Sequence, residues 1–299
     1  MFNSPIHPLK TGIAFTNAVA STYWAPDTGL INCWCCPPGT SKVEVWLIGG
    51  GGGGGGGGVQ FGANTWGGGG AGGGGGGISS CIFYGNQIPA SAAVCLGAGG
   101  AGGAGSITVP FTCATNGANG GMTSFGSIVH AGGGGGGQRG RSGVCNQVAE
   151  STGGAGGTGN FSPRGGSGGN GYFFPTVPNP GNEAFPGLYQ GGGGAGGGAG
   201  TFGGVTDFQA GALSDPAGLL PLPVSNFGPG TCGIGILNVC TGAGGAQCTG
   251  FINGQNAINC VPNYGGGGGG GGGARSGGGT TAGSGGLGAP GVALVISYF

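Results

Sequence analysis

Charged residues are scarce in this chain. Only six of its 299 residues are Lys or Arg and six are Asp or Glu, so the formal net charge is zero. Binding of nucleic acid needs clustered surplus cations, and this composition excludes it as a function. Long apolar runs are missing too, because Gly, Pro or Asn interrupts every run of Val, Ile and Leu. We therefore expect no transmembrane helix and no membrane insertion.

Helical periodicity is also absent, and glycine takes its place with 93 residues. Each glycine inside an α-helix costs about 1 kcal/mol relative to alanine, which excludes ordinary helical folds. Collagen is excluded because the glycines form unbroken runs instead of occupying every third position. A flexible linker array or an ordered bundle of polyglycine II helices remains. The 15 Phe, 6 Tyr and 4 Trp residues favour the ordered bundle.

The glycine runs predict seven to nine rods. A polyglycine II rod has three residues per turn and no internal hydrogen bonds, so it persists only when neighbouring rods pair with its N–H and C=O groups. The longest runs are 49–58, 72–77, 132–137, 191–198 and 265–273, and shorter ones are 97–105 and 153–159.

Two β-type segments, 42–48 and 291–299, bracket these runs, and we expect them to pair. Further strand-like segments are 78–84, 92–96 and 127–130. The predicted fold is a polyglycine II bundle closed by a small β-sheet, with irregular loops and almost no α-helix.

A shift in composition at residue 42 divides the chain. Residues 1–42 are predicted to be an N-terminal attachment segment, with Trp24 and Trp34 as attachment residues. Residues 43–299 are predicted to be the glycine-rich domain. Its non-glycine insertions are 78–96, 106–130, 138–152, 160–190 and 201–264.

The insertion 160–190 is the candidate binding surface. It concentrates aromatic residues among prolines, and rigid aromatic loops supply contact area at low entropy cost. The alternative is that these rings cap the ends of the rods. Arg164 joins Arg139 and Arg141 in a cationic cluster that either meets an anionic glycan or keeps the surface soluble. The aromatic candidates are Tyr172, Phe173, Phe174, Phe185 and Tyr189.

The cysteines number eleven, an odd count. If ten of them are oxidised in pairs, one is free or pairs between chains. Cys232, Cys240 and Cys248 recur at intervals of eight, with Cys260 beyond, and these four are candidates for disulfides or free thiols. Reduced, buried thiols remain the alternative. With only two histidines in the chain, we predict no metal site.

The sequence offers few candidate catalytic residues. The six carboxylates are scattered singly, and His130 is the one candidate base near serines and cysteines. We therefore predict that the protein is not an enzyme and needs no cofactor.

The order of motifs resembles the glycine-rich domains of tailed-bacteriophage tail-fibre proteins, including the tail-fibre-tip adhesins of T-even-like phages. The resemblance covers about residues 37–299 and includes the Pro-Pro-Gly-Thr-Ser-Lys turn at 37–42 and the glycine block from residue 49. Its most specific motifs are Gly-Met-Thr-Ser-Phe-Gly at 121–126 and Gly-Ala-Pro-Gly-Val at 288–292.

The resemblance implies a virion surface protein, assembled in the host cytoplasm, whose loops bind a bacterial surface protein or glycan. Its other partners would be virion proteins of a tail fibre or baseplate, with a trimer as one arrangement. The alternatives are a capsid decoration or assembly protein and a self-assembling extracellular filament subunit.

Overall fold

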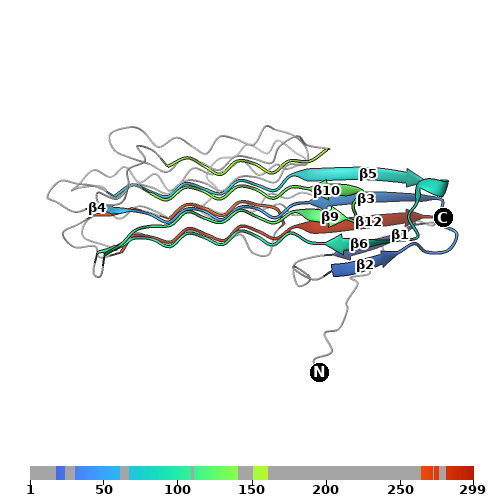
Figure 1. Ribbon diagram of the computed structural model, residues 1–299, viewed down its shortest axis with the longest axis horizontal. Coiled ribbons are helices and arrows are strands. Elements are labelled where there is room, and N and C mark those ends of the chain that lie inside the picture. Colours follow the sequence, from blue (N-terminus) through green and yellow to red (C-terminus); the bar gives the residue numbers. More distant parts are fainter. Residues whose placement is uncertain are drawn as a thin grey trace, which may run out of the picture.

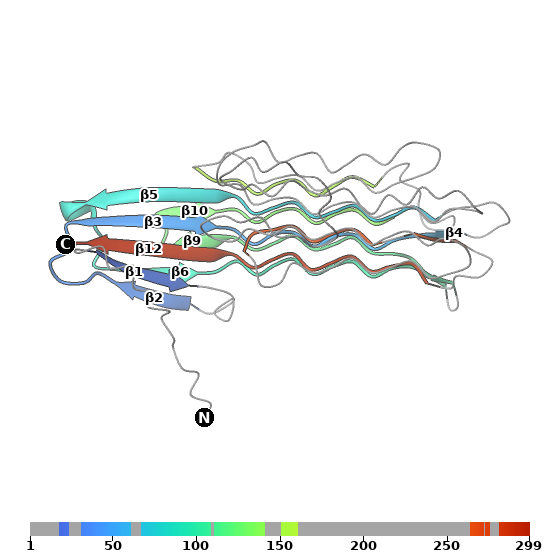
Figure 2. The ribbon, with the colours of Figure 1, turned by 180° about the vertical axis from the view of Figure 1, so that it is seen from behind.

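The computed structural model describes residues 18–23, 31–60, 67–108, 111–140, 151–160, 264–271, 273–275 and 281–299. These residues form a long body with a β-sandwich at one end and extended glycine-rich segments at the other (Figure 1). The view from behind shows the same division (Figure 2).

The first sheet has four antiparallel strands in the order β1-β12-β3-β5. Its strands alternate apolar and polar residues, and every second side chain of β3 is buried before the strand runs into the bundle. That alternation places one face on a core and the other toward solvent. The bounds are β1 Ala18–Tyr23, β3 Lys42–Ile48, β5 Ile78–Tyr84 and β12 Val292–Tyr298.

The second sheet also has four antiparallel strands, in the order β10-β9-β6-β2. Its inner face packs on the first sheet, and the two share one cluster of buried side chains. Phe125 is fully buried at the centre, with the ring of Trp34 at 5.5 Å and that of Phe83 at 6.2 Å between centroids. The bounds are β2 Ile31–Cys35, β6 Ser91–Cys95, β9 Thr123–Phe125 and β10 Val129–Ala131.

Smaller elements lie outside the sandwich. β4 (Val59–Gln60) pairs in parallel with β11 (Ala274–Arg275), and β7 (Ile107–Thr108) pairs with β8 (Phe111–Thr112). A short 3-10 helix, η2 (Gly85–Gln87), follows β5.

Eight extended segments, here called rods 1 to 8, make up most of the remaining described residues, and six of them lead directly from or into a strand of the sandwich. β3 runs into rod 1, and rod 8 runs into β12, so the sheets fix where each rod starts. In chain order the rods are 49–58, 67–77, 97–106, 113–122, 132–140, 151–160, 264–271 and 281–291.

Rod 1 lies at the centre of the bundle and bonds to six neighbours with a three-residue repeat. The N–H groups of Gly52, Gly53 and Gly54 donate to rods 2, 4 and 8, and the same three directions recur one repeat further on. The carbonyl oxygens of rod 1 accept from rods 3, 5 and 7 in the same way. Donor and acceptor neighbours thus alternate around the central rod, and the backbone is satisfied without side chains.

The six neighbours of rod 1 also bond to one another in a closed ring. The order around the ring is rod 2, rod 5, rod 4, rod 3, rod 8, rod 7 and back to rod 2. Rod 6 lies outside this ring and bonds to rods 2 and 5. The hydrogen-bond partners show that the chain direction alternates between adjacent members of the ring.

Glycine is required inside the bundle because the rods approach too closely for a side chain. A Cβ built on Gly51 or Gly54 would lie well within 3 Å of a carbonyl oxygen of rod 7, a separation that real Cβ atoms do not adopt. Side chains return on the outer rods at every third position. Ala98, Ala101 and Ala104 are exposed in this way on rod 3.

Asparagine side chains complete the bonding of an outer rod. Asn116 and Asn119 on rod 4 are three residues apart, and their Oδ1 atoms accept the backbone N–H groups of Arg139 and Gly136 at 2.9 and 2.8 Å. They thus bond two N–H groups of rod 5 that no backbone carbonyl of the described rods accepts.

We expect Asn119→Ala to lower the free energy of unfolding by about 1 kcal/mol, because the Gly136 N–H loses its acceptor. Denaturant unfolding measures the change. Asn119→Asp keeps an acceptor oxygen at this position and serves as the matched control, so equal losses in the two variants would refute the role of this bond.

Several expectations from the sequence are confirmed and one is revised. The segments 42–48 and 78–84 are strands, and the pairing of 42–48 with the C-terminal strand is observed. The described residues are nearly all β, with almost no helix. The small closing sheet is instead two packed four-stranded sheets, because short strands next to rods 3, 4 and 5 form a second layer. The predicted strands at 92–96 and 127–130 lie at 91–95 and 129–131.

The predicted attachment segment contributes to both sheets. β1 pairs with β12 and β2 pairs with β6, so strands from both sides of residue 42 share the sandwich.

Candidate functional site

Most of the predicted site residues lie outside the described residues. Of the two tryptophans predicted for attachment, Trp34 lies in the sandwich core with 3% of its surface exposed. Its ring packs on Phe125, so this position contributes to folding and offers no exposed indole to a partner. The residues outside the described ranges are Tyr172, Phe173, Phe174, Phe185, Tyr189, Arg164, Trp24, Cys232, Cys240, Cys248 and Cys260.

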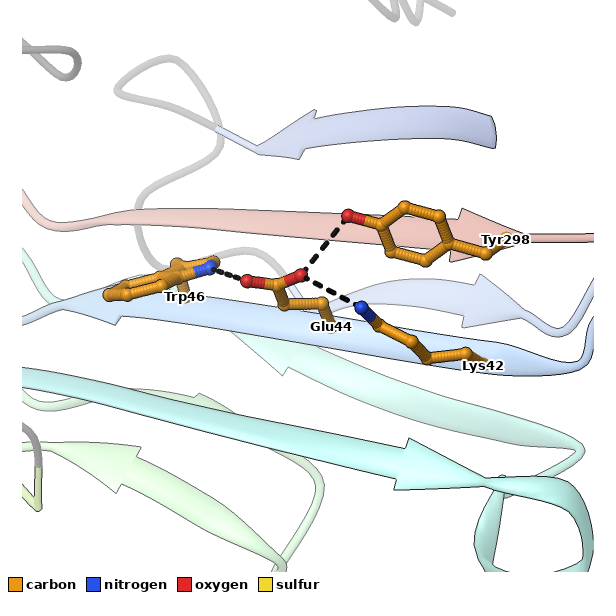
Figure 3. A network of polar contacts seen from close by, with 4 residues as sticks. All are labelled: Lys42, Glu44, Trp46 and Tyr298. Atoms are coloured by element: carbon orange, nitrogen blue, oxygen red, sulfur yellow. Dashed lines mark hydrogen bonds and ion pairs between the residues drawn. The ribbon is translucent and has the colours of Figure 1, made fainter. Parts of the chain in front are cut away.

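A polar network lies on the outer face of the first sheet. The Glu44 carboxylate accepts a hydrogen bond from the Trp46 Nε1–H at 2.8 Å and another from the Tyr298 hydroxyl at 3.1 Å (Figure 3). The Lys42 ammonium lies 3.6 Å from the same carboxylate and 4.2 Å above the centre of the Tyr298 ring. These contacts hold two aromatic rings in fixed positions on an open face.

The strand register extends this network into an aromatic and apolar surface. Lys42 is paired with Tyr298 on one side and Tyr84 on the other, and Glu44 is paired with Ile82. Tyr84 is 56% exposed and Ile82 is 45% exposed. Fixed aromatic rings beside apolar side chains suit contact with another surface. The sequence analysis missed this surface, although the alternation of Lys42, Glu44 and Trp46 along one strand indicates a shared face.

The pKa of the Tyr298 phenol is raised, first by burial and then by its hydrogen bond to Glu44 and the charge of that carboxylate. Folding therefore favours the neutral phenol. This contribution to stability is complete below the unfolded pKa of about 10 and is lost as the pH rises through the higher folded value.

We expect the free energy of unfolding of the wild type to fall above pH 10 more steeply than that of Tyr298→Phe. Denaturant unfolding between pH 8 and 11 measures both slopes, with Tyr84→Phe, exposed in the same cross-strand row, as the control. Parallel curves for the wild type and Tyr298→Phe would contradict this role of the phenol.

Two exposed thiols lie together on β2. Cys33 and Cys35 are two residues apart in one strand, so both point away from the core while Trp34 points into it. A hydrogen bond to Cys35 and the influence of its charge raise the pKa of the Cys33 thiol. Cys36 has Cys-x-x-Cys spacing to Cys33, but its side chain packs against the sandwich core, on the opposite face of the strand from Cys33 and Cys35. The pattern Cys-Trp-Cys in a strand is the signal that the sequence analysis did not use.

Among the described residues, chemistry-bearing groups are few. Glu44 is the only carboxylate side chain in this part of the chain, and His130 is exposed on the outer face of the second sheet. The Arg139 guanidinium donates to the Ala114 carbonyl at 3.3 Å, whereas Arg141 lies outside the described residues.

No three His, Cys, Asp or Glu residues in the described ranges are grouped closely enough to hold a metal ion. The same ranges contain no helix of the length and apolarity needed to cross a membrane.

The sandwich and its rods define a β-protein whose strands extend into glycine-rich segments. The family model of the glycine-rich domain matches residues 27–298, and the chain belongs to this family. No curated protein matches the chain.

Proposed function

We propose that the rods are polyglycine II helices. The three-residue repeat of hydrogen-bond partners supports this proposal, because a polyglycine II helix has three residues per turn and directs its N–H and C=O groups outward. An experimental structure tests it. Backbone angles near φ −75° and ψ +145° in residues 49–58 are expected, and β-strand angles near φ −140° would refute it.

We propose that the protein is a tail-fibre adhesin of a bacteriophage, which recognises the host surface through loops carried on the glycine-rich bundle. The observation that carries the proposal is the exclusion of side chains from the bundle interior. Because a Cβ at Gly51 or Gly54 would overlap rod 7, the rods themselves have little chemistry to offer a ligand. Recognition then falls to the segments between rods, of which 160–190 is rich in aromatic residues.

The motif resemblance to tail-fibre proteins adds the virion location to this proposal. The partners would be a bacterial surface protein or glycan at the loops and other virion proteins at the N-terminal region. Neither a cofactor nor an enzymatic activity is part of the proposal. The alternative functions are a capsid assembly protein and a filament subunit, and immunogold labelling distinguishes both from an adhesin.

Host adsorption of particles carrying loop variants tests the recognition role. Phe173→Ala combined with Phe174→Ala is expected to lower the adsorption rate at least about tenfold if these rings are binding anchors. Particles must assemble normally, which electron microscopy checks. Ile128→Ala, an exposed position between β9 and β10 and outside the aromatic surface of the first sheet, is the control that should adsorb as the wild type does. Unchanged adsorption of the double variant would refute these residues as receptor contacts.

Immunogold electron microscopy tests the location. An antibody against residues 160–190 should label the distal tips of tail fibres. Label over capsids would instead favour an assembly protein, and label along free filaments would favour a filament subunit.

A further inference from the structure

β2 is the edge strand of the second sheet, and its outer edge is open among the described residues. The Cys36 N–H donates to the Ala90 carbonyl at 2.9 Å, and the register pairs Cys35 with Ser91 and Cys33 with Ala93. In an antiparallel ladder the backbone groups of successive residues alternate in direction. The N–H and C=O groups of Ile31, Cys33 and Cys35 therefore point away from β6, toward the open edge.

Nothing on β2 protects this edge. Edge strands usually carry a charged side chain, often a lysine, or a proline, and either one blocks pairing with a second chain. β2 reads Ile-Asn-Cys-Trp-Cys, with no charge and no proline. The side chains on its solvent face are Ile31, which is 76% exposed, and the exposed thiols of Cys33 and Cys35.

We propose that β2 pairs antiparallel with β2 of a second copy of this chain, and that a disulfide between the two Cys33 residues locks the pair. Centring the pairing on Cys33 aligns all five residues of both strands. Ile31 then lies opposite Cys35 of the second copy, and Cys33 lies opposite its own equivalent. Each of these pairs exchanges two backbone hydrogen bonds.

Spacing favours a bond between copies over one within the strand. Directly opposed residues in a hydrogen-bonded antiparallel pair have Cα atoms about 5.5 Å apart, within the usual Cα range for a disulfide. Their Cβ atoms lie up to about 5.5 Å apart, so the two strands move about 1 Å closer at Cys33 when the bond forms. Cys33 and Cys35 in one extended strand are about 6.7 Å apart, at the upper limit of that range. The neighbouring Cys35 thiol therefore does not compete well for Cys33.

The covalent step uses a small-molecule disulfide such as oxidised glutathione as the oxidant. The thiolate of one Cys33 attacks it and releases one reduced glutathione. The thiolate of the second Cys33 then attacks the mixed disulfide and releases the other. Two protein thiols are oxidised to one disulfide, and one glutathione disulfide is reduced to two thiols. Because Cys35 raises the pKa of Cys33, the exchange is run at about pH 8.5, where more thiolate is present.

The test equilibrates the full chain with oxidised and reduced glutathione and measures covalent dimer on a non-reducing gel. Wild type and Cys35→Ser should form the dimer, and Cys33→Ser should lose it. Ile31→Lys places a charge at the open edge and should reduce the dimer at least about tenfold. Ile128→Lys is the matched control and should behave as the wild type does, because Ile128 is 51% exposed and lies between β9 and β10, away from the β2 edge.

Four results would overturn the proposal. They are a wild type that gives only monomer or a glutathione adduct, a Cys33→Ser variant with undiminished dimer, an Ile31→Lys variant with undiminished dimer, and loss of the dimer in Cys35→Ser. The last would mean that Cys33 bonds to Cys35 of the other copy in a shifted register. Circular dichroism confirms that each variant is folded.

Discussion

Gly54→Ala is expected to lower the free energy of unfolding by about 4 kcal/mol or more, because it creates an overlap that no rotamer can relieve. The added Cβ would meet the carbonyl group of Gly269 in rod 7, which is backbone and cannot move without its rod. Gly54 also donates to Gly286 and accepts from Gly103. Any shift of Gly54 that makes room for the methyl group therefore breaks its bonds to two neighbouring rods, rods 8 and 3.

Denaturant unfolding of the purified variant measures this loss. Ala101→Ser is the matched control, because Ala101 lies in the exposed row of rod 3 and its change should stay within about 0.5 kcal/mol. The contrast tests the bundle directly, since Gly→Ala substitutions ordinarily stabilise a chain whose backbone can accept them. A loss under 1 kcal/mol for Gly54→Ala would mean that the rods are further apart than described.

The sequence predicts the strands that border the glycine runs better than it predicts their partners. Lys42–Ile48 alternates polar and apolar residues, so its type and bounds are readable from local pattern alone. Thr123–Phe125 has only three residues, too few for a periodic signal, yet both Thr123 and Phe125 are fully buried. The Gly-Met-Thr-Ser-Phe-Gly motif at 121–126 thus has a physical role, because its Phe125 supplies the central ring of the sandwich core.

The order of the rods could not be predicted from sequence, because glycine runs have no side chains to distinguish one neighbour from another. The structure indicates what sets this order. Six rods are continuous with strands whose side chains do pair specifically, so the sandwich determines which rods lie side by side. The exposed thiols of Cys33 and Cys35 were likewise predictable only once Trp34 was placed in the core.

This dependence of the rods on the sandwich leads to the second large effect. Phe125 packs on Trp34 of β2 and on Phe83 of β5, and so joins the two sheets. Phe125→Ala is expected to lower the free energy of unfolding by about 3–5 kcal/mol, because it leaves a cavity between the sheets. Phe125→Leu keeps most of the volume and should cost clearly less.

Hydrogen exchange read out by mass spectrometry distinguishes a local defect from a loss of the whole bundle. Gly50 of rod 1 donates to Gly121, two residues before β9 begins, so a shift of this short strand is passed to the rods it joins. We expect the amides of residues 49–58 to lose protection together with those of β3 in Phe125→Ala. If the rods kept wild-type protection while β3 exchanged freely, the bundle would hold its register without the sandwich, and its order would have to arise from the glycine rods themselves.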